Sequence, residues 1–159
     1  MSYLDSERNT FNIQTNIDNS PSAQTSSSLW QDLAASDITY NCYGNPSFVM
    51  YEYTTSINYS THVFATLDFK LVQYNTSTSS WEDANASQQV SWGMSGSGYP
   101  GEFKTFTFIL DSWDGDKQLK AQWKKVSGGA KVQYAYTINT SGAGVWYNPK
   151  PFLIVKSIK

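Results

Sequence analysis

Charged residues, cysteine and histidine are all scarce in this sequence. Only 15% of the 159 residues are charged, against about a quarter in typical soluble domains, and the net charge is −2. A chain without a positive excess lacks the electrostatic attraction on which nucleic-acid binding depends, so we expect no nucleic-acid partner. The one cysteine, Cys42, excludes an intrachain disulfide, and we expect it to be a small buried apolar residue.

Long hydrophobic segments are missing as well. No apolar run approaches the length of a membrane-spanning helix, and the N-terminus lacks the basic lead and apolar centre of a signal peptide. We therefore expect no membrane partner, and synthesis in the reducing cytoplasm of a host cell. The length favours one domain, which we place at residues 11–159 after a polar N-terminal arm at residues 1–10.

The side chains that most enzymes use for catalysis are poorly represented. The only histidine, His62, has no nucleophile motif near it and no second histidine or cysteine at metal-ligand spacing. Glu52 and Asp68 would approach each other if their segments form a hairpin, as the two acids of a glycosidase must, but an ordinary polar pair is the simpler interpretation. We therefore predict that the protein is not an enzyme and needs no cofactor.

Aromatic residues, in contrast, are abundant at 16%, and many lie in alternating segments. The longest such stretch runs from Phe48 to Tyr74, and its period of two in aromatic and β-branched residues predicts two long strands. A polar join at residues 58–61 predicts that these strands form a hairpin, which needs a second sheet to cover its apolar face. The residues predicted to share that face are Val49, Tyr51, Tyr53, Thr55, Ile57, Val63, Ala65, Leu67, Phe69 and Leu71.

Shorter alternating segments predict the remaining strands, at residues 11–17, 37–41, 87–92, 102–110, 117–126, 132–138 and 152–158. Segments rich in glycine, proline, serine and asparagine separate them and predict turns. The segment 152–158 is apolar on both of its faces for four residues, which predicts an interior strand. The predicted fold class is all-β, a two-sheet antiparallel jelly-roll sandwich of about nine to ten strands.

Two groups of side chains in predicted loops have alternative interpretations. Asp111, Asp114 and Asp116 form a weak candidate site for a hard cation such as Ca²⁺, but the spacing is incomplete and Asp114-Gly115 suits a tight turn. The loop aromatics either contact a surface glycan or close the open ends of the sandwich, and the sequence favours neither. These aromatics are Tyr99, Trp113, Trp146 and Tyr147.

Short segments spread over most of residues 30–123 resemble, in their order and spacing, a family of jelly-roll domains in phage and large DNA virus proteins. The family occurs in tail fibres, head fibres and minor capsid proteins, and it is similar to trimeric tumour-necrosis-factor-like and complement-globular-head folds. The resemblance implies a homotrimeric virion protein, either a capsid decoration or cement protein or a fibre knob, that contacts major capsid or other virion proteins. The matching segments are Trp30–Leu33, Asp37–Tyr40, Val49–Tyr53, Phe69–Leu71, Tyr99–Phe103, Asp111–Gly115 and Lys117–Lys120.

Bulky residues on the second face of the predicted hairpin also favour a subunit interface, because a two-layer sandwich buries only one face of each strand. An exposed aromatic strand face in a monomer is the alternative. A carbohydrate-binding adhesin module, with the loop aromatics as its sugar platform, is the second functional hypothesis. The predicted interface residues are Phe48, Met50, Phe64, Val72 and Tyr74.

Overall fold

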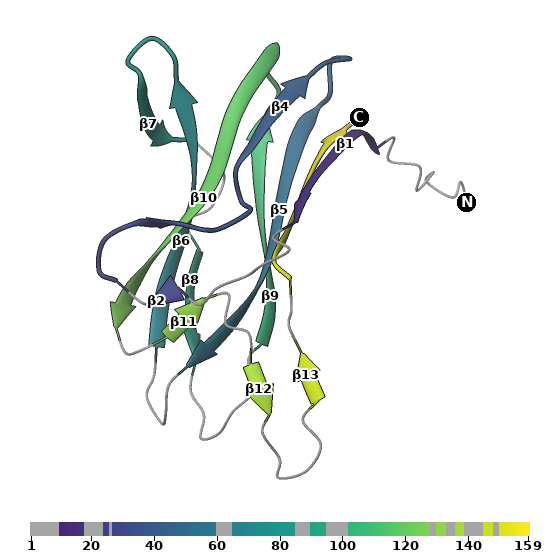
Figure 1. Ribbon diagram of the computed structural model, residues 1–159. Helices are drawn as coiled ribbons and strands as arrows, with labels where there is room; N and C mark the ends of the chain where they lie inside the picture. The colour runs from purple at the N-terminus through teal and green to yellow at the C-terminus, as the bar shows by residue number, and fades with distance from the viewer. Residues whose placement is uncertain are drawn as a thin grey trace, which may run out of the picture.

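Two antiparallel β-sheets pack against each other in the computed structural model, and every element that it describes is a strand (Figure 1). The structure describes residues 10–17, 24–25, 27–59, 65–84, 90–94, 102–127, 130–132, 136–138, 145–147 and 150–159. Within these ranges there is no helix of the length and hydropathy needed to span a bilayer. The predicted all-β class, with two packed sheets, is confirmed.

The first sheet is built around β5, which has β14 on one side and β9 on the other. β14 pairs in turn with β1, so the strand predicted to be interior does lie between two neighbours. The short strands β11 and β2 extend the sheet beside the last residues of β5. The members of the first sheet are β1 (Thr10–Ile17), β2 (Gln24–Thr25), β5 (Phe48–Tyr59), β9 (Glu102–Asp111), β11 (Ala130–Val132) and β14 (Phe152–Ile158).

The second sheet is built around the pair formed by β10 and β6. The far side of β10 pairs with β4 and β3, and the far side of β6 pairs with β7 and β8. Two further strands, β12 (Tyr136–Ile138) and β13 (Val145–Tyr147), form a separate ribbon. The members of the second sheet are β3 (Gln31–Asp32), β4 (Ile38–Cys42), β6 (Ala65–Asn75), β7 (Ser80–Asp83), β8 (Val90–Met94) and β10 (Gly115–Ser127).

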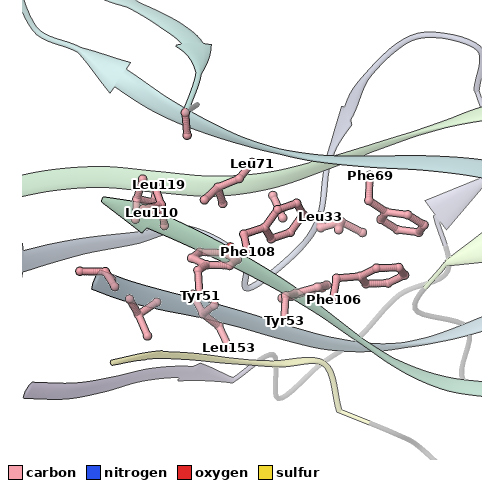
Figure 2. Packing of buried hydrophobic residues seen from close by; sticks show 14 of the residues in the cluster. Leu33, Tyr51, Tyr53, Phe69, Leu71, Phe106, Phe108, Leu110, Leu119 and Leu153 are labelled. Atoms are coloured by element: carbon pink, nitrogen blue, oxygen red, sulfur yellow. The ribbon is translucent and has the colours of Figure 1, made fainter. Parts of the chain in front are cut away.

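The core lies between the inward faces of the two sheets (Figure 2). Phe69 on β6 stacks on Phe106 on β9, with ring centroids 3.8 Å apart, and this contact joins one sheet to the other. Trp123 on β10 is among the largest fully buried side chains. Cys42 is also buried in this cluster, as its sequence context predicted. Burial of this apolar surface is the main stabilising term of the sandwich.

Ser36, in the segment between β3 and β4, links the two sheets through hydrogen bonds. Its hydroxyl donates to the carbonyl of Leu33 at 2.6 Å and accepts the backbone N–H of Ala121 on β10 at 3.1 Å. Its own carbonyl accepts the hydroxyl of Tyr51 on β5. Burial raises the pKa of Tyr51 well above its usual value, so this hydroxyl remains a donor throughout the neutral range.

The predicted hairpin of residues 48–74 is wrong. β5 and β6 are indeed long strands, but β5 belongs to the first sheet and β6 to the second. Their apolar rows therefore face each other across the core instead of lying side by side on one face. Val63 and the side chain of Ala65 lie outside the described residues. For the other residues of the two rows, which are all buried, the period of two correctly predicted the inward direction, because it depends on each strand alone. It carries no information about which strand is the hydrogen-bonded neighbour.

Two other connections also pass from one sheet to the other, which the alternating pattern does not predict. The predicted tight turn at Asp114-Gly115 lies in the segment that joins β9 in the first sheet to β10 in the second. The segment 132–138, predicted as one strand, contributes to β11 in the first sheet and to β12 in the separate ribbon. The alternating pattern within one segment does not show whether the next strand belongs to the same sheet.

Gly44, in the turn predicted before β5, is required by both its conformation and its surroundings. Its φ is +77°, and a Cβ at this position would lie 3.0 Å from the ring of Phe11. Gly44→Ala should therefore lower the free energy of unfolding by about 1–2 kcal/mol or more, measured by urea denaturation. Gly115→Ala is the matched control, because Gly115 has a φ of +81° with nothing within 4 Å of the added Cβ. Equal losses in the two variants would show that the contact with Phe11 is unimportant.

Candidate functional site

The outward face of the second sheet is covered by ion pairs. Burial raises the pKa of Asp32, but hydrogen bonds from Lys120 and Gln122 outweigh this effect and hold the pKa below its usual value. A face on which each lysine meets an aspartate is well suited to water and offers little unpaired charge to a partner. The pairs are Lys70 with Asp83 at 2.7 Å, Lys120 with Asp32 at 2.6 Å, and Lys124 with Asp68 at 3.6 Å.

The same lysines cover the indole rings on this face. The ammonium groups of Lys70 and Lys124 lie 4.6 and 4.7 Å from the ring centroid of Trp30. The ammonium of Lys120 lies 4.0 Å from the ring centroid of Trp81. These cation–π contacts occupy ring surface that would otherwise be available to a partner.

The outward face of the first sheet has a different character. Ile17 is 51% exposed and Ile109 is 42% exposed, and the outward-facing side chains between them across the sheet include Phe152, Ile154 and Met50 beside threonines and one ion pair. The strand register places Ile17 opposite Phe152 and Ile109 opposite Met50, so these side chains lie in neighbouring positions. We call this surface the apolar face, and it consists of Ile17, Phe48, Met50, Ile109, Phe152 and Ile154.

An ion pair lies within the apolar face. Lys156 on β14 and Glu52 on β5 approach to 2.6 Å, and each side chain is 25% exposed. Ile154 on β14 is the register partner of Glu52, and Met50 is the register partner of Lys156. One positive and one negative group are therefore embedded side by side among apolar residues.

The predicted interface residues are divided between the two sheets. Phe48 and Met50 lie on the apolar face of the first sheet. Val72 and Tyr74 lie on the outward face of β6 in the second sheet, where Val72 is only 2% exposed. The set therefore does not form one continuous surface, because its members were grouped on the assumption of a hairpin. Phe64 lies outside the described residues.

The two acids considered as a glycosidase pair also lie on different sheets. Glu52 faces outward from the first sheet and pairs with Lys156, whereas Asp68 faces outward from the second sheet and pairs with Lys124. The whole sandwich separates them, so the proximity that the hairpin would have produced does not occur. His62 lies outside the described residues.

The acidic residues at the turn between β9 and β10 are all exposed. Asp116 accepts a hydrogen bond from the amide of Asn41 at 2.6 Å, and Asp111 is the last residue of β9. Among the residues that the structure describes, no group of three or more histidine, cysteine or acidic side chains is placed to hold a metal ion. The turn geometry at Gly115, with its positive φ, accounts for the local sequence.

Trp113 packs against the core instead of projecting from its loop. Its ring lies edge-on to Tyr40 at 5.8 Å, and its indole N–H donates to the carbonyl of Gly115 at 3.0 Å. The ammonium of Lys117 lies 4.6 Å from its ring centroid. Trp113 thus closes one end of the sandwich, which is one of the two roles that its sequence position left open. Tyr99 and the side chains of Trp146 and Tyr147 lie outside the described part of the structure.

A polar cleft of about 480 Å³, lined in part by Lys117, opens between the end of β6 and the start of β10. The amides of Gln73 and Asn75 donate to the two carboxylate oxygens of Glu82 at 2.9 and 3.0 Å. These hydrogen bonds lower the pKa of Glu82. Burial lowers the pKa of Lys117. The sequence analysis missed this cleft, since its walls come from β4, β6, β7 and β10 and no single segment carries a motif.

Comparison of the sequence with protein-family models and with curated proteins finds no match. The two outward faces and the cleft are the features of the described structure that bear on function. The contrast between the faces is the most informative feature, because both belong to one sandwich and differ so strongly in charge.

Proposed function

We propose that this protein is a structural subunit of a virus particle and that it assembles with copies of itself through the apolar face. The observation that carries the self-assembly is the difference between the two outward faces. The second sheet presents three lysine–aspartate pairs to water, whereas the first sheet presents six apolar side chains around one ion pair. Contiguous exposed apolar surface of this kind marks interaction sites, and homomeric interfaces are richer in it than other surfaces.

A second copy of the chain suits the apolar face better than an unrelated partner. Glu52 and Lys156 lie next to each other, so a second copy presents the same two charges in return. An arrangement that places the Lys156 of one copy near the Glu52 of another would keep both charges paired inside the interface. Complementary charges set register and exclude wrong partners. In a threefold arrangement, each copy would therefore offer its neighbours apolar surface and both members of the charge pair.

The pairing of strands supports the jelly-roll assignment. A jelly roll is a long antiparallel ribbon wound into two sheets, so its first strand pairs with its last, its second with its seventh, and so on inward. All four of these pairs are present among the eight main strands, which are β1, β4, β5, β6, β8, β9, β10 and β14. They are β1 with β14, β4 with β10, β5 with β9, and β6 with β8. This topology agrees with the resemblance to virion jelly-roll proteins.

The homotrimer and the location in a virion as a capsid decoration, cement or fibre-knob protein rest on that resemblance. The apolar face supports them by supplying a surface for assembly. Contact with major capsid or other virion proteins follows from the same proposal. A role without catalysis is consistent with the placement of Glu52 and Asp68 on different sheets, where each is paired with a lysine.

Light scattering coupled to size exclusion tests the assembly. The expected mass of the native protein is three times the chain mass of 17.8 kDa. Ile109→Asp and Ile17→Asp should each yield a folded monomer, because a buried unpaired carboxylate would be costly in the interface while both side chains are exposed in the single chain. Far-UV circular dichroism and a thermal midpoint close to that of the native protein would confirm that the monomers are folded.

Val126→Asp is the matched control for these two variants. Val126 is 54% exposed, but it lies on β10 in the second sheet, so its replacement should leave the trimer intact. A native protein that stays monomeric at all concentrations, or trimers that survive both apolar-face substitutions, would contradict the proposed interface. A dimer mass would contradict the trimer and leave the face as the site of a twofold contact.

A further inference from the structure

The polar cleft between β6 and β10 arises from a fork in the second sheet. β6 and β10 pair from Thr66 and Ser127 as far as Gln73 and Leu119, and there the two strands part. Beyond this point β6 continues beside β7, and the start of β10 continues beside β4. Figure 1 shows the β6–β7 ribbon standing apart from β10 at this end. The space between them, about 480 Å³, is within the range of small-molecule sites, about 300–1,000 Å³.

We propose that this cleft binds a neutral saccharide. Its wall contains two carboxylates, Glu82 and Asp116, and one ammonium, Lys117, together with side-chain amides and hydroxyls. Most small-molecule sites are predominantly apolar, whereas every residue that lines this one carries a side-chain hydrogen-bond donor or acceptor. A sugar, whose hydroxyls each donate and accept, matches such a wall. An anion would meet the two carboxylates, and a cation would meet Lys117.

The acceptor side of the cleft is ordered without a ligand. Gln73 and Asn75 each donate to a different oxygen of Glu82, so the plane of the carboxylate is held from both sides. Asn75 is itself held, because its carbonyl oxygen accepts the backbone N–H groups of Ser77 and Thr78 at 2.9 and 3.3 Å. Each carboxylate oxygen retains acceptor capacity for a sugar hydroxyl. Such preorganisation reduces the entropy lost on binding.

The remaining wall supplies hydrogen-bond donors. Lys117 stands on the β10 side of the fork, and its contact with the Trp113 ring limits the positions of its ammonium while leaving N–H donors for a ligand. Asp116 next to it is held by the amide of Asn41. Tyr74 also lines the cleft from β6, and its ring packs edge-to-face on Trp81 at 5.4 Å on the outward face.

Amide chemical-shift titration by NMR tests the proposal with named probes. The panel consists of the methyl glycosides of glucose, galactose, mannose and N-acetylglucosamine, with N-acetylneuraminic acid as the anionic comparison. We expect at least one neutral glycoside to give saturable shifts at the backbone amides of Gln73, Lys117 and Gln118, which border the fork. Absence of shifts there at tens of millimolar for every neutral sugar, or saturable shifts with the anionic sugar alone, would overturn the proposal.

Glu82→Ala should weaken binding of that glycoside about ten- to hundredfold, since it removes hydrogen bonds to a charged acceptor. Asp83→Ala is the matched control, because Asp83 is the next residue of β7 and pairs with Lys70 on the outward face instead of lining the cleft. Equal affinities for the two variants would overturn the assignment. If Glu82→Ala does not give a dispersed spectrum, Gln73→Ala provides the same comparison. Ile109→Asp should bind the sugar normally, which separates failure of the cleft from failure of the proposed assembly.

Discussion

Replacing Trp123 with alanine is expected to lower the free energy of unfolding by about 3–5 kcal/mol. Trp123 lies in the middle of β10 with 0% of its surface exposed, and its register partners are Phe69 on β6 and Gln31 on β3. Truncation removes the transfer free energy of the indole and leaves a cavity between two sheets that cannot close around it. Since small domains have only about 5–15 kcal/mol in total, the loss is a large share of stability. Urea denaturation followed by circular dichroism measures it.

Val126→Ala on the same strand is the control for this prediction. Val126 is 54% exposed, so its truncation should change the free energy of unfolding by no more than about 0.5 kcal/mol. Trp123→Phe should fall between the two, because it retains an aromatic ring in the cavity. A loss for Trp123→Ala no larger than that for Val126→Ala would mean that the core does not lie where the structure places it.

Ser36→Ala is expected to lower the free energy of unfolding by about 1–3 kcal/mol, although it removes a single oxygen atom. Ser36 is completely buried, and its hydroxyl accepts the backbone N–H of Ala121 and donates to Leu33. Without it, the N–H of Ala121 loses this acceptor in a place that bulk water does not reach. The same equilibrium denaturation experiment provides the measurement.

Ser47→Ala is the matched serine for comparison. Ser47 is exposed just before β5, and its backbone N–H donates to the carbonyl of Ile158 at 2.8 Å, a bond that alanine preserves. Its replacement should be close to neutral. If Ser36→Ala were equally neutral, the hydrogen bonds of Ser36 would contribute nothing beyond what water provides to the unfolded chain.

The inward rows of the long strands could be predicted from the sequence, and their pairing could not. Val49, Tyr51 and Tyr53 on β5, and Leu67 and Phe69 on β6, are all fully buried, as their spacing predicted. Side-chain alternation is a property of one strand, so it survives any arrangement of neighbours. The partners of β5 come from β9 and β14, far away in the chain, and only the crossovers between sheets determine them.

The candidate sites show the same limit. The apolar run in β14 predicts an interior strand. Because the run is apolar on both faces of the strand, it also places Phe152 and Ile154 on the outward face, where they form part of the apolar face. The cleft has no comparable signal. Gln73, Glu82 and Lys117 each resemble an ordinary solvent-exposed residue in the sequence, and only the fork between β6 and β10 brings them together.

The position of β14 between β1 and β5 has a consequence for the order in which the protein is made. When β1, β5 and β9 have been synthesised, three strands of the first sheet exist, but β14, which lies between β1 and β5 in the sheet, does not. Among the described strands, β1 has no backbone ladder partner other than β14, so it joins the sheet only once β14 has been made. The first sheet is therefore completed only after synthesis has reached Ile158, and the apolar face, which contains side chains from β1, β5, β9 and β14, becomes whole at the same moment. If the chain assembles as proposed, newly made chains thus have no complete interface until β14 has joined the first sheet.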